Sequence, residues 1–498
     1  MPRPERVDPV PLSSLGAPGV VVDGAGNDTV TGVTATSGDV RPGDLFAALP
    51  GRAAHGAQFA ADAIARGAVA VLTDAAGRGL VPGAVPVLVA TDVRAVLGPV
   101  SAAVYGHPSR AMRMLGVTGT SGKTTTAYFL RAALERAGRS SALIGTVATM
   151  IGDAVVKTGF TTPEAPDVQG LLAVMRERGI SDVAMEVSSH ALDLGRVGGI
   201  WFDLGAFTNL SQDHLDFHAD MAAYFAAKAK LFEQTEQPVI VVDDEWGRRL
   251  ADRLGSSVTV SVASPERATW WAAAIDERPD GTTTFDVHHA DGVRVHAATV
   301  IPGRFNVTNA LLAIAMLHHD GIDPQLAADA ISTATVPGRM ERIDAGQDFL
   351  AVVDYSHKPA AVEGALAALR PLTRGRLIIV LGCGGDRDQA KRPRMGAIAA
   401  RDADLLIVTD DNPRSENPAL IRREMLSGVE TVPPGGRGDV REIGDRADAI
   451  AAAVAAANPG DTVLLAGKGH ETGQEIAGVV YPFDDRDVLR AALEEGAA

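Results

Sequence analysis

The sequence predicts an α/β fold of three domains, in which helices flank mostly parallel sheets. Apolar strand-like runs alternate with helical stretches through most of the 498 residues, as in parallel α/β proteins. Turn clusters at residues 106–109 and 336–338 interrupt this alternation and are natural boundaries. Because about 150 residues make a typical domain, we place the domains at residues 1–110, 111–336 and 337–498.

The elements of each domain follow from their hydrophobic patterns. The first domain is predicted to be a smaller α/β unit, with strands at 44–49 and 68–72 and a helix at 57–66. In the second, Thr- and Val-rich runs within 258–300 predict an antiparallel excursion from a mostly parallel sheet. Its other expected elements are strands at 183–187, 204–207 and 239–242, and helices at 127–137, 222–232 and 306–319.

The third domain is predicted to be a second α/β unit, doubly wound. An Ala-rich helix at 447–457 precedes Asn458, Pro459 and Gly460, which form a strong helix stop. Helical stretches separate the expected strands, which lie at 350–353, 377–381, 405–408 and 463–465.

The composition excludes several classes of protein. A formal net charge of −16 argues against a nucleic-acid binder, which needs a basic face. The single cysteine, Cys383, excludes an intrachain disulfide and fits a reducing compartment. The sequence has neither a secretory signal nor a run of 18 apolar residues. We therefore expect a cytoplasmic protein with no membrane or nucleic-acid partner.

A phosphate-binding loop is the strongest chemical signal. The segment GVTGTSGKTTT at residues 116–126 lies between an apolar run and a helical stretch. Glycines let backbone N–H groups approach an anion at a helix N-terminus. Lys123 would reach the β- and γ-phosphates, and the Thr124 hydroxyl would bind Mg²⁺. The central domain is thus predicted to be P-loop ATPase-like and to bind ATP through Gly119, Thr120, Ser121, Gly122, Lys123, Thr124 and Thr125.

This loop departs from the standard P-loop spacing. The standard pattern requires glycine where this chain has Val117. The shorter pattern that begins at Gly119 also occurs in ordinary turns, and such a turn is the alternative to a phosphate site. The strand before the loop and the helix after it favour the phosphate site.

Polar clusters follow the expected strands, and ligands bind at the carboxyl ends of strands in open α/β sheets. The clusters lie at 188–190, 208–209, 354–358, 382–388, 409–414 and 467–471. Glu186 ends an apolar strand, where a charge is costly unless it is paired or binds a metal; it is either a Mg²⁺ ligand or a solvent-facing strand end. The His- and Asp-rich run at 208–218 favours a metal or transfer role. By spacing alone, Lys228 and Lys230 are solvated.

Three further features have two interpretations each. Arg414 in the segment DNPR either belongs to a plain turn or grips a carboxylate with two hydrogen bonds. Residues 467–471, GKGHE, resemble a second phosphate loop but lack Ser or Thr after the lysine. Cys383 lies between glycines, and we interpret it as a small buried residue rather than a nucleophile.

Taken together, these segments resemble the Mur ligase family, the ATP-dependent amide-forming enzymes of peptidoglycan synthesis. The similarity covers nearly the whole chain and includes GTSGKTT at 119–125, MEVSSH at 185–190, TNLSQDHLDFH at 208–218, GRFNVTN at 303–309 and GKGHE at 467–471. It implies an N-terminal UDP-binding domain, a central ATPase domain and a C-terminal Rossmann-like domain. We also expect a monomer.

The resemblance implies a particular reaction. The intact DNPR segment at 411–414 implies a ligase that adds meso-diaminopimelate to the D-Glu carboxylate of UDP-MurNAc-L-Ala-D-Glu through an acyl phosphate. The alternatives are the L-lysine-adding enzymes of the same step, which usually lack this arginine, and folylpolyglutamate synthase, which lacks DNPR and a comparable first domain. A nucleotide-binding switch protein is the alternative outside the ligases.

Residue roles also follow from the resemblance. It implies catalytic roles for Lys123, Glu186, His214 and Lys228, and it implies that CO₂ converts Lys228 into a carbamate, whereas Lys230 has no counterpart. His214 is also a candidate general base, although metal ligation would occupy it. The implied Mg²⁺ ligands are Thr124, Glu186, His214 and carboxylated Lys228; the implied nucleotide contacts outside the loop are Asn306, Asn309, Arg339 and Asp354, with Lys358 near the γ-phosphate.

The implied substrate contacts form two groups. Those to the UDP-sugar-peptide are Thr161, Thr162, Ser188 and Arg196, with Ser37 and His55 on the uridine side. Those to diaminopimelate are Arg387, Asp411, Asn412, Arg414, Gly467 and Glu471.

Overall fold

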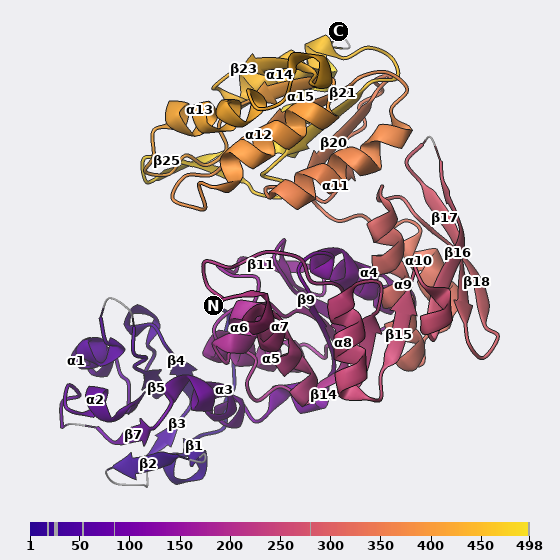
Figure 1. The fold of residues 1–498 in the computed structure, drawn as a ribbon. Helices are drawn as coiled ribbons and strands as arrows, with labels where there is room; N and C mark the ends of the chain where they lie inside the picture. Colours follow the sequence, from indigo (N-terminus) through magenta and orange to yellow (C-terminus); the bar gives the residue numbers. More distant parts are fainter. Residues whose placement is uncertain (17–18, 24–27, 52–53, 84, 279, 497–498) are drawn as a thin grey trace. The chain divides into compact units, whose positions relative to one another are not determined.

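The computed structural model describes residues 1–496 except 17–18, 24–27, 52–53, 84 and 279. The described chain divides into two compact units (Figure 1). The first unit contains Met1–Trp271 and Leu312–Ala327, and the second contains Ala272–Leu311 and Ala328–Ala498. The first unit thus contains the predicted first domain together with most of the predicted second. The division into three domains at residues 110 and 336 stays a prediction.

The N-terminal part of the first unit has a five-stranded sheet with the order β2-β7-β6-β5-β4. Strands β4 to β7 are parallel to their neighbours, and β2 is antiparallel to β7. Leu45, Leu72 and Leu88 from this sheet pack with helix α3 (Val93–Val104) in one buried cluster. The strands of this sheet are β2 (Val20–Asp23), β4 (Gly32–Thr34), β5 (Asp44–Ala47), β6 (Ala70–Thr73) and β7 (Val87–Ala90). Strands β1 (Val10–Pro11) and β3 (Thr29–Val30) pair in a separate two-stranded sheet.

The helix predicted at 57–66 forms as a 3-10 turn, η3 (Gly56–Phe59), followed by α1 (Ala60–Ala65). The other short or helical elements of this region are η1 (Leu12–Leu15), η2 (Ser37–Asp39), α2 (Ala75–Arg78), α3 (Val93–Val104) and η4 (Pro108–Ala111).

A larger sheet begins at residue 113 and has the order β11-β10-β9-β12-β8-β13-β14-β15-β16-β17-β18. The pairs from β9 to β16 are parallel. Its strands are β8 (Arg113–Thr118), β9 (Ser141–Ile144), β10 (Thr149–Ile151), β11 (Ala154–Val156), β12 (Asp182–Glu186), β13 (Phe202–Phe207), β14 (Thr235–Val241), β15 (Val258–Ser261), β16 (Trp270–Glu277), β17 (Thr283–His289) and β18 (Arg294–Thr299).

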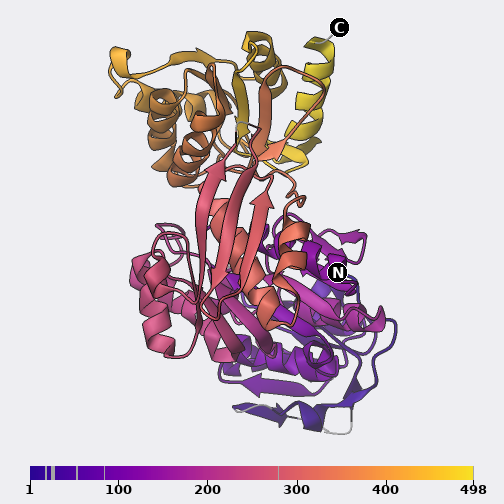
Figure 2. The same cartoon turned by 90° about the vertical axis from the view of Figure 1, so that its right-hand side faces the viewer.

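The antiparallel excursion predicted within 258–300 is confirmed by β17 and β18, which pair antiparallel from Thr283–Thr299 to His288–Arg294. Figure 2 shows these two long strands side by side with β16. The helices of this region are α4 (Lys123–Arg136), α5 (Ala165–Glu177), α6 (Ser189–Asp193), α7 (Met221–Ala229), η5 (Lys230–Gln234), α8 (Glu245–Leu254), η6 (Pro265–Arg267), α9 (Arg304–His319) and α10 (Pro324–Ile331).

The C-terminal sheet has six strands in the order β19-β20-β24-β21-β22-β23. Its neighbours are parallel except for β19, which is antiparallel to β20. Helices lie on both faces of this sheet (Figure 1), as predicted for a doubly wound unit. The strands are β19 (Glu341–Arg342), β20 (Leu350–Asp354), β21 (Leu377–Leu381), β22 (Leu405–Val408), β23 (Asp439–Glu442) and β24 (Thr462–Ala466), followed by the hairpin β25 (Gly473–Ile476) and β26 (Val479–Pro482).

The core of this sheet is aliphatic, in keeping with a chain in which only 4% of the residues are aromatic. Ile378, Val380 and Val463 share a buried cluster with Ile450 of α14 and Leu489 of α15. The helices are α11 (Pro359–Leu369), η7 (Arg370–Leu372), α12 (Lys391–Asp402), α13 (Pro418–Val429), η8 (Pro434–Gly436), α14 (Arg446–Ala456) and α15 (Asp485–Gly496). The predicted α/β class is confirmed.

Candidate nucleotide and amino-acid sites

The phosphate loop of the first unit joins β8 to α4. The backbone is left-handed at Gly119, with φ +144°, and at Gly122, with φ +90°. A Cβ at Gly119 would lie 1.8 Å from Thr208 Oγ1, so this position accepts only glycine without rearrangement. Helix α4 begins at Lys123, four residues before the predicted start. A helix N-terminus beside a glycine-rich loop is a place where backbone N–H groups can bind an anion.

The segment after β13 holds the loop in place. Ser121 N–H donates to Asn209 Oδ1 (3.0 Å), and Asn209 Nδ2 donates back to the Ser121 carbonyl (3.1 Å). Thr208 Oγ1 donates to the same carbonyl at 2.6 Å. The polar pair predicted at this strand end thus fixes the conformation of the loop.

Two lysines converge on the loop backbone. Lys123 Nζ donates to the carbonyls of Gly119 (2.8 Å) and Thr120 (2.9 Å). Lys228 Nζ donates to the Gly119 carbonyl at 2.7 Å and lies 4.5 Å from the ring centre of Tyr224. Lys228 is 1% exposed, so the interpretation of a solvated lysine is wrong for it. Lys230 is exposed and pairs with Asp193, as its spacing predicted.

Glu186 is buried at the end of β12 and is not a solvent-facing strand end. Its carboxylate accepts hydrogen bonds from Thr124 Oγ1 (2.9 Å), Thr146 N–H (2.7 Å) and Thr146 Oγ1 (3.0 Å). A buried carboxylate is stable only with such donors. The sequence analysis did not predict a role for Thr146. This residue closely follows strand β9, and a polar residue just after a strand is the pattern that indicated the other clusters.

The oxygen atoms of Thr124 and Glu186 fit a magnesium site. Mg²⁺ binds through one or two carboxylates and the phosphates of the substrate, and this hydroxyl and carboxylate lie beside the phosphate loop. The described residues contain no cluster of three or more His, Cys, Asp or Glu side chains suited to a metal. One hydroxyl and one carboxylate suit a Mg²⁺ ion that takes its other ligands from nucleotide phosphates and water.

The predicted contacts to the UDP-sugar-peptide lie next to Glu186. Thr161 Oγ1 is 3.0 Å from Thr146 Oγ1, and Thr162 Oγ1 donates to the Glu186 carbonyl at 2.9 Å. Arg196 donates to the Thr162 carbonyl at 3.0 Å. Ser188 caps α6 by accepting from Ala191 N–H and lies two residues after Glu186. The structure thus brings these predicted residues together.

The histidines of the 208–218 run gather beside the same helix, α6. His214 has a left-handed backbone, φ +53°, and its Nε2 is 3.2 Å from Asp213. Its ring lies 4.7 Å from that of His190, and His218 Nε2 is 3.0 Å from Ser189 Oγ. Burial lowers the pKa of His190 and of His218. Near neutral pH both rings are therefore neutral hydrogen-bonding groups.

The uridine-side residues lie in the N-terminal sheet region. Ser37 begins η2, next to a hollow of about 280 Å³ that Arg3, Gly38 and Asp39 help to line. His55 Nδ1 accepts from Ala57 N–H, and its Nε2 is 3.1 Å from Asp74. Both ring nitrogens of His55 are therefore engaged within this region, where the ring caps η3.

Replacing Gly119 by alanine is expected to raise the KM for ATP by at least about tenfold, a loss of ~1.4 kcal/mol. The added Cβ collides with Thr208, which holds the Ser121 carbonyl. Steady-state kinetics on the purified variant measure this. The control is Gly138→Ala, which has a left-handed backbone too but no atom within 4 Å of the new Cβ. Equal KM values for the two variants would contradict the steric argument.

The second unit contains the other predicted nucleotide residues. Asn309 Nδ2 donates to Asn306 Oδ1 at 3.0 Å, and both side chains are buried in α9. Asp354 accepts from Met340 N–H (2.8 Å) and Ser356 N–H (2.9 Å). Arg339 lies over the Tyr355 ring at 4.5 Å, and its Nε is buried with no hydrogen-bond partner among the described residues. Lys358 precedes α11 as its N-cap residue.

The predicted diaminopimelate residues gather at the carboxyl ends of β22 and β24. Asn412 Nδ2 donates to Glu471 Oε2 at 2.7 Å, and Asp411 is 6% exposed. Gly467 has φ +115°, and a Cβ there would lie 2.5 Å from Asp411 Oδ2. Lys468 is completely buried and donates to three oxygens. Because its donors are used, the second phosphate loop considered for 467–471 is wrong.

Arg414 and Arg387 are placed differently at this edge. Arg414 has a left-handed backbone, φ +51°, and its guanidinium donates to the Gly385 carbonyl (2.7 Å) and lies 3.4 Å from Glu475. Arg387 is exposed. Burial raises the pKa of Cys383 to about 12, which agrees with the interpretation of a small buried residue.

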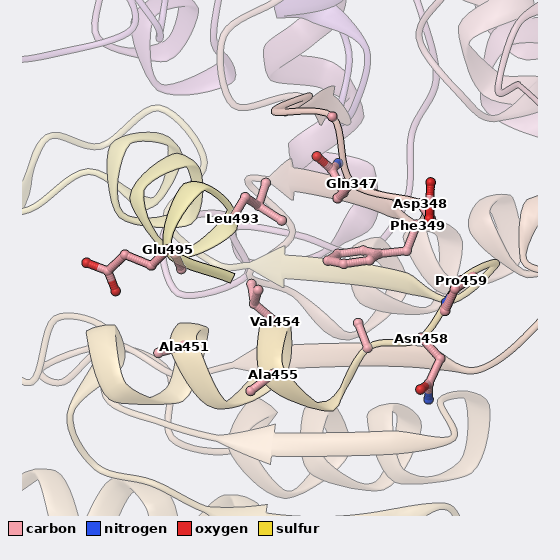
Figure 3. Close-up of a pocket in the computed structure, with 13 residues that line it drawn as sticks. Gln347, Asp348, Phe349, Ala451, Val454, Ala455, Asn458, Pro459, Leu493 and Glu495 are labelled. Carbon is pink, nitrogen blue, oxygen red and sulfur yellow. The ribbon is translucent and has the colours of Figure 1, made fainter. Parts of the chain in front are cut away.

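A groove of about 600 Å³ lies elsewhere in the second unit (Figure 3). Phe349, Val454 and Leu493 line it, together with Asn458 and Glu495. These residues precede β20 and β24 or lie on α14 and α15, at the amino ends of the strands. The predicted amino-acid residues follow the carboxyl ends of the same sheet, so this groove is a separate feature.

Comparisons with known proteins agree with this arrangement. Three family models match the chain: the Mur ligase family catalytic domain at residues 29–105, the Mur ligase middle domain at 117–317 and the Mur ligase glutamate ligase domain at 338–469. The chain is 53% identical to UDP-N-acetylmuramoyl-L-alanyl-D-glutamate–2,6-diaminopimelate ligase of Streptomyces avermitilis, over 99% of this chain and 98% of the relative.

The chain belongs to the Mur ligase family. A second relative, the enzyme of the same name from Corynebacterium glutamicum, is 49% identical over 96% of this Mur ligase and 95% of its own length. A solved structure of a ligase with that name superposes with a TM-score of 0.71 at 31% identity, covering 99% and 100% of the two chains. The MurF structure from Acinetobacter baumannii has a TM-score of 0.66 at 16% identity, over 98% of this chain and 99% of that one, which shows the shared fold.

No helix among the described residues of this Mur ligase is long and apolar enough to span a membrane.

Proposed function

We propose that this Mur ligase uses ATP to join meso-2,6-diaminopimelate to the D-Glu carboxylate of UDP-MurNAc-L-Ala-D-Glu, with release of ADP and phosphate. The observation that carries the proposal is the strand-end site in which Asp411, Asn412 and Glu471 lie together, with Arg414 in the same DNPR loop. Carboxylate, amide and guanidinium groups in one site complement a substrate end that carries both an ammonium and a carboxylate.

The names of the relatives support diaminopimelate over the alternatives. Relatives at 41–53% identity carry the name of the 2,6-diaminopimelate ligase. A structure of Mycobacterium tuberculosis folylpolyglutamate synthase superposes with a TM-score of 0.59 at 17% identity, a level that supports a common fold only. The lysine-adding enzyme remains the alternative that a direct assay must separate.

The chemistry requires an activated carboxylate, because a free carboxylate does not react with an amine. An oxygen of the D-Glu carboxylate attacks the γ-phosphorus, and the bond from that phosphorus to the ADP oxygen breaks, which gives an acyl phosphate. The amine then attacks the acyl carbon; phosphate leaves, and the amine loses a proton. Lys123 and the N–H groups at the start of α4 would stabilise the charge that spreads over the equatorial oxygens of the phosphoryl group.

The metal assignment is part of the same proposal. Thr124 and Glu186 would hold Mg²⁺, which neutralises phosphate charge when it is bound. Lys228, buried beside Gly119, would carry a carbamate and, with His214, hold a second cation. Thr161, Thr162, Ser188 and Arg196 would orient the UDP-sugar-peptide next to Glu186, with Ser37 and His55 on the uridine side.

The remaining residues would act from the second unit. Asn306, Asn309, Arg339, Asp354 and Lys358 would contact the nucleotide, and Arg387 and Gly467 would complete the amino-acid site. We also propose a monomer that works in the cytoplasm and is organised as a UDP-binding domain (1–110), an ATP-binding domain (111–336) and an amino-acid-binding domain (337–498). The single cysteine agrees with a reducing compartment.

The proposal is tested by measuring ADP release from ATP and UDP-MurNAc-L-Ala-D-Glu with diaminopimelate or lysine as the third substrate. We expect release with diaminopimelate and little with lysine. Release with lysine alone would replace the proposed substrate, and release that responds to no amino acid would favour a nucleotide-dependent switch protein.

Replacing Arg414 by alanine is expected to weaken diaminopimelate binding by ~1.5–3 kcal/mol, the range for a hydrogen bond to a charged group. The guanidinium is anchored by Gly385, so it is held in one orientation for a substrate carboxylate. The measurement is KM for diaminopimelate, with KM for ATP as the internal reference. Unchanged values of kcat and KM would remove Arg414 from the site.

A further inference from the structure

Lys468 is a buried cation at the amino-acid site that the proposed chemistry does not use. Its side chain is 0% exposed, and lysine is almost never fully buried unless its charge is paired. It follows β24 directly after Gly467, at the carboxyl end of the sheet. The hydrogen bonds of the buried ammonium therefore show which groups Lys468 holds in this site.

The three N–H groups of the ammonium are all used within the site. Lys468 Nζ donates to the Gly473 carbonyl (2.7 Å), to Asn412 Oδ1 (3.2 Å) and to Glu471 Oε2 (3.3 Å). An ammonium has three donors and no acceptor. Lys468 is thus saturated by the protein and does not bind the substrate itself.

These bonds determine the orientation of the Asn412 amide. Asn412 Oδ1 accepts from Lys468 Nζ and from Glu475 N–H (3.0 Å). With two donors on one side of the amide, the nitrogen must lie on the other side, where Nδ2 donates to Glu471 Oε2 at 2.7 Å. A flipped amide would set its NH₂ group against the lysine ammonium and against an N–H group.

The same bonds orient Glu471. Its Oε2 accepts hydrogen bonds from both Lys468 and Asn412. Among the described contacts, Oε1 is thus the carboxylate oxygen left to accept from a ligand. Burial and the nearby Asp411 raise the pKa of Glu471, whereas Lys468 and Asn412 act in the opposite direction. The second N–H of Asn412 and Oε1 of Glu471 are thus the donor and the acceptor that these bonds leave for a ligand.

We propose that Lys468 is a positioning residue that locks Asn412 and Glu471 in the arrangement that recognises the ammonium and carboxylate of the amino-acid substrate. This inference rests on the proposed function, because it assigns the strand-end site to the amino acid. Lys468 acts through its two neighbours and never touches the substrate. Its removal should therefore affect one substrate and leave the other two unaffected.

The test compares Lys468→Met with the unmodified enzyme by steady-state kinetics for each of the three substrates. Methionine keeps an unbranched apolar stem and removes all three donors. We expect KM for diaminopimelate to rise at least about tenfold, as for the loss of a charged hydrogen bond, with KM for ATP and for the UDP-sugar-peptide within about twofold. The control Arg376→Met also removes a cation bonded to a buried carboxylate, Asp461. Both residues lie at the amino ends of the strands, away from the amino-acid site.

A double-variant cycle separates positioning from a general loss of structure. The Lys468→Met substitution is made in the unmodified enzyme and in the Asn412→Ala variant, and the fold-rise in KM for diaminopimelate is compared. If Lys468 acts through Asn412, the rise in the Asn412→Ala background should be at least threefold smaller. Full additivity, an unchanged KM, or equal rises for all three substrates would overturn the inference. If no amino acid stimulates ADP release by the unmodified enzyme, the proposed function fails, and the inference fails with it. If the unmodified enzyme is active and the Lys468→Met variant has the same KM for diaminopimelate, only the inference fails.

Discussion

Replacing Lys123 by methionine is expected to lower kcat for ADP formation by at least about 10³-fold, or ~4 kcal/mol of transition-state stabilisation. The ammonium is held at the phosphate loop by the carbonyls of Gly119 and Thr120, at 2.8 and 2.9 Å. It therefore lies at the loop that we propose binds the phosphates of ATP. Charge develops on the phosphoryl group during transfer, so the loss should appear in kcat more than in the KM for ATP.

The control for this experiment is Lys230→Met. Lys230 is also a lysine of the first unit, but its side chain is 44% exposed and pairs with Asp193 at the surface. Its loss should change kcat by less than about twofold, in keeping with the small energies of surface ion pairs. A Lys123→Met enzyme with kcat within tenfold of the unmodified value would show that the loop lysine does not stabilise phosphoryl transfer.

Breaking the buried ion pair between Arg446 and Asp485 is expected to have the largest effect on stability. Both side chains are 0% exposed, and the two guanidinium–carboxylate hydrogen bonds are 2.7 Å long. Arg446 also donates to the Ala466 carbonyl, next to Gly467. Replacing Asp485 by asparagine leaves the guanidinium buried without its counter-charge, which should cost about 3–5 kcal/mol.

Native-state hydrogen exchange is the suitable measurement for this variant, since it reports on β21 and β24 separately from the first unit. The control Arg401→Met removes a guanidinium that pairs with Glu363 and Asp402 on the surface, and it should cost less than about 1 kcal/mol. If the amide protons of β21 and β24 are as well protected from exchange in the Asp485→Asn variant as in this control, the buried pair contributes nothing to the stability of the sheet.

The elements with strong local patterns were predictable. Apolar runs such as 377–381 and 405–408 form strands wherever they are buried on both faces of a parallel sheet, and they appear as β21 and β22. The start of α4 was less predictable. Three consecutive threonines weaken a helix by their local preference, yet the phosphate loop starts the helix at Lys123.

The chemistry of the candidate sites was predictable to a different degree for each residue. Glu186 and the DNPR segment stand at strand ends, and their residue types indicated a ligand site. The burial of Lys228 could not be predicted, because on a short helix its spacing is that of any surface lysine. Its contact with the Gly119 carbonyl joins residues 109 positions apart.

The order of residue types along the chain was enough to define the α/β class, the phosphate loop and the strand ends where ligands bind, since each depends on contacts between near neighbours. Which charged groups are buried, and which hydrogen bonds compensate their lost hydration, depended on the folded molecule. The Thr124–Glu186–Thr146 bonds and the Lys468–Asn412–Glu471 bonds join separate strand ends. Such groups meet only when parallel strands align their carboxyl ends at one edge.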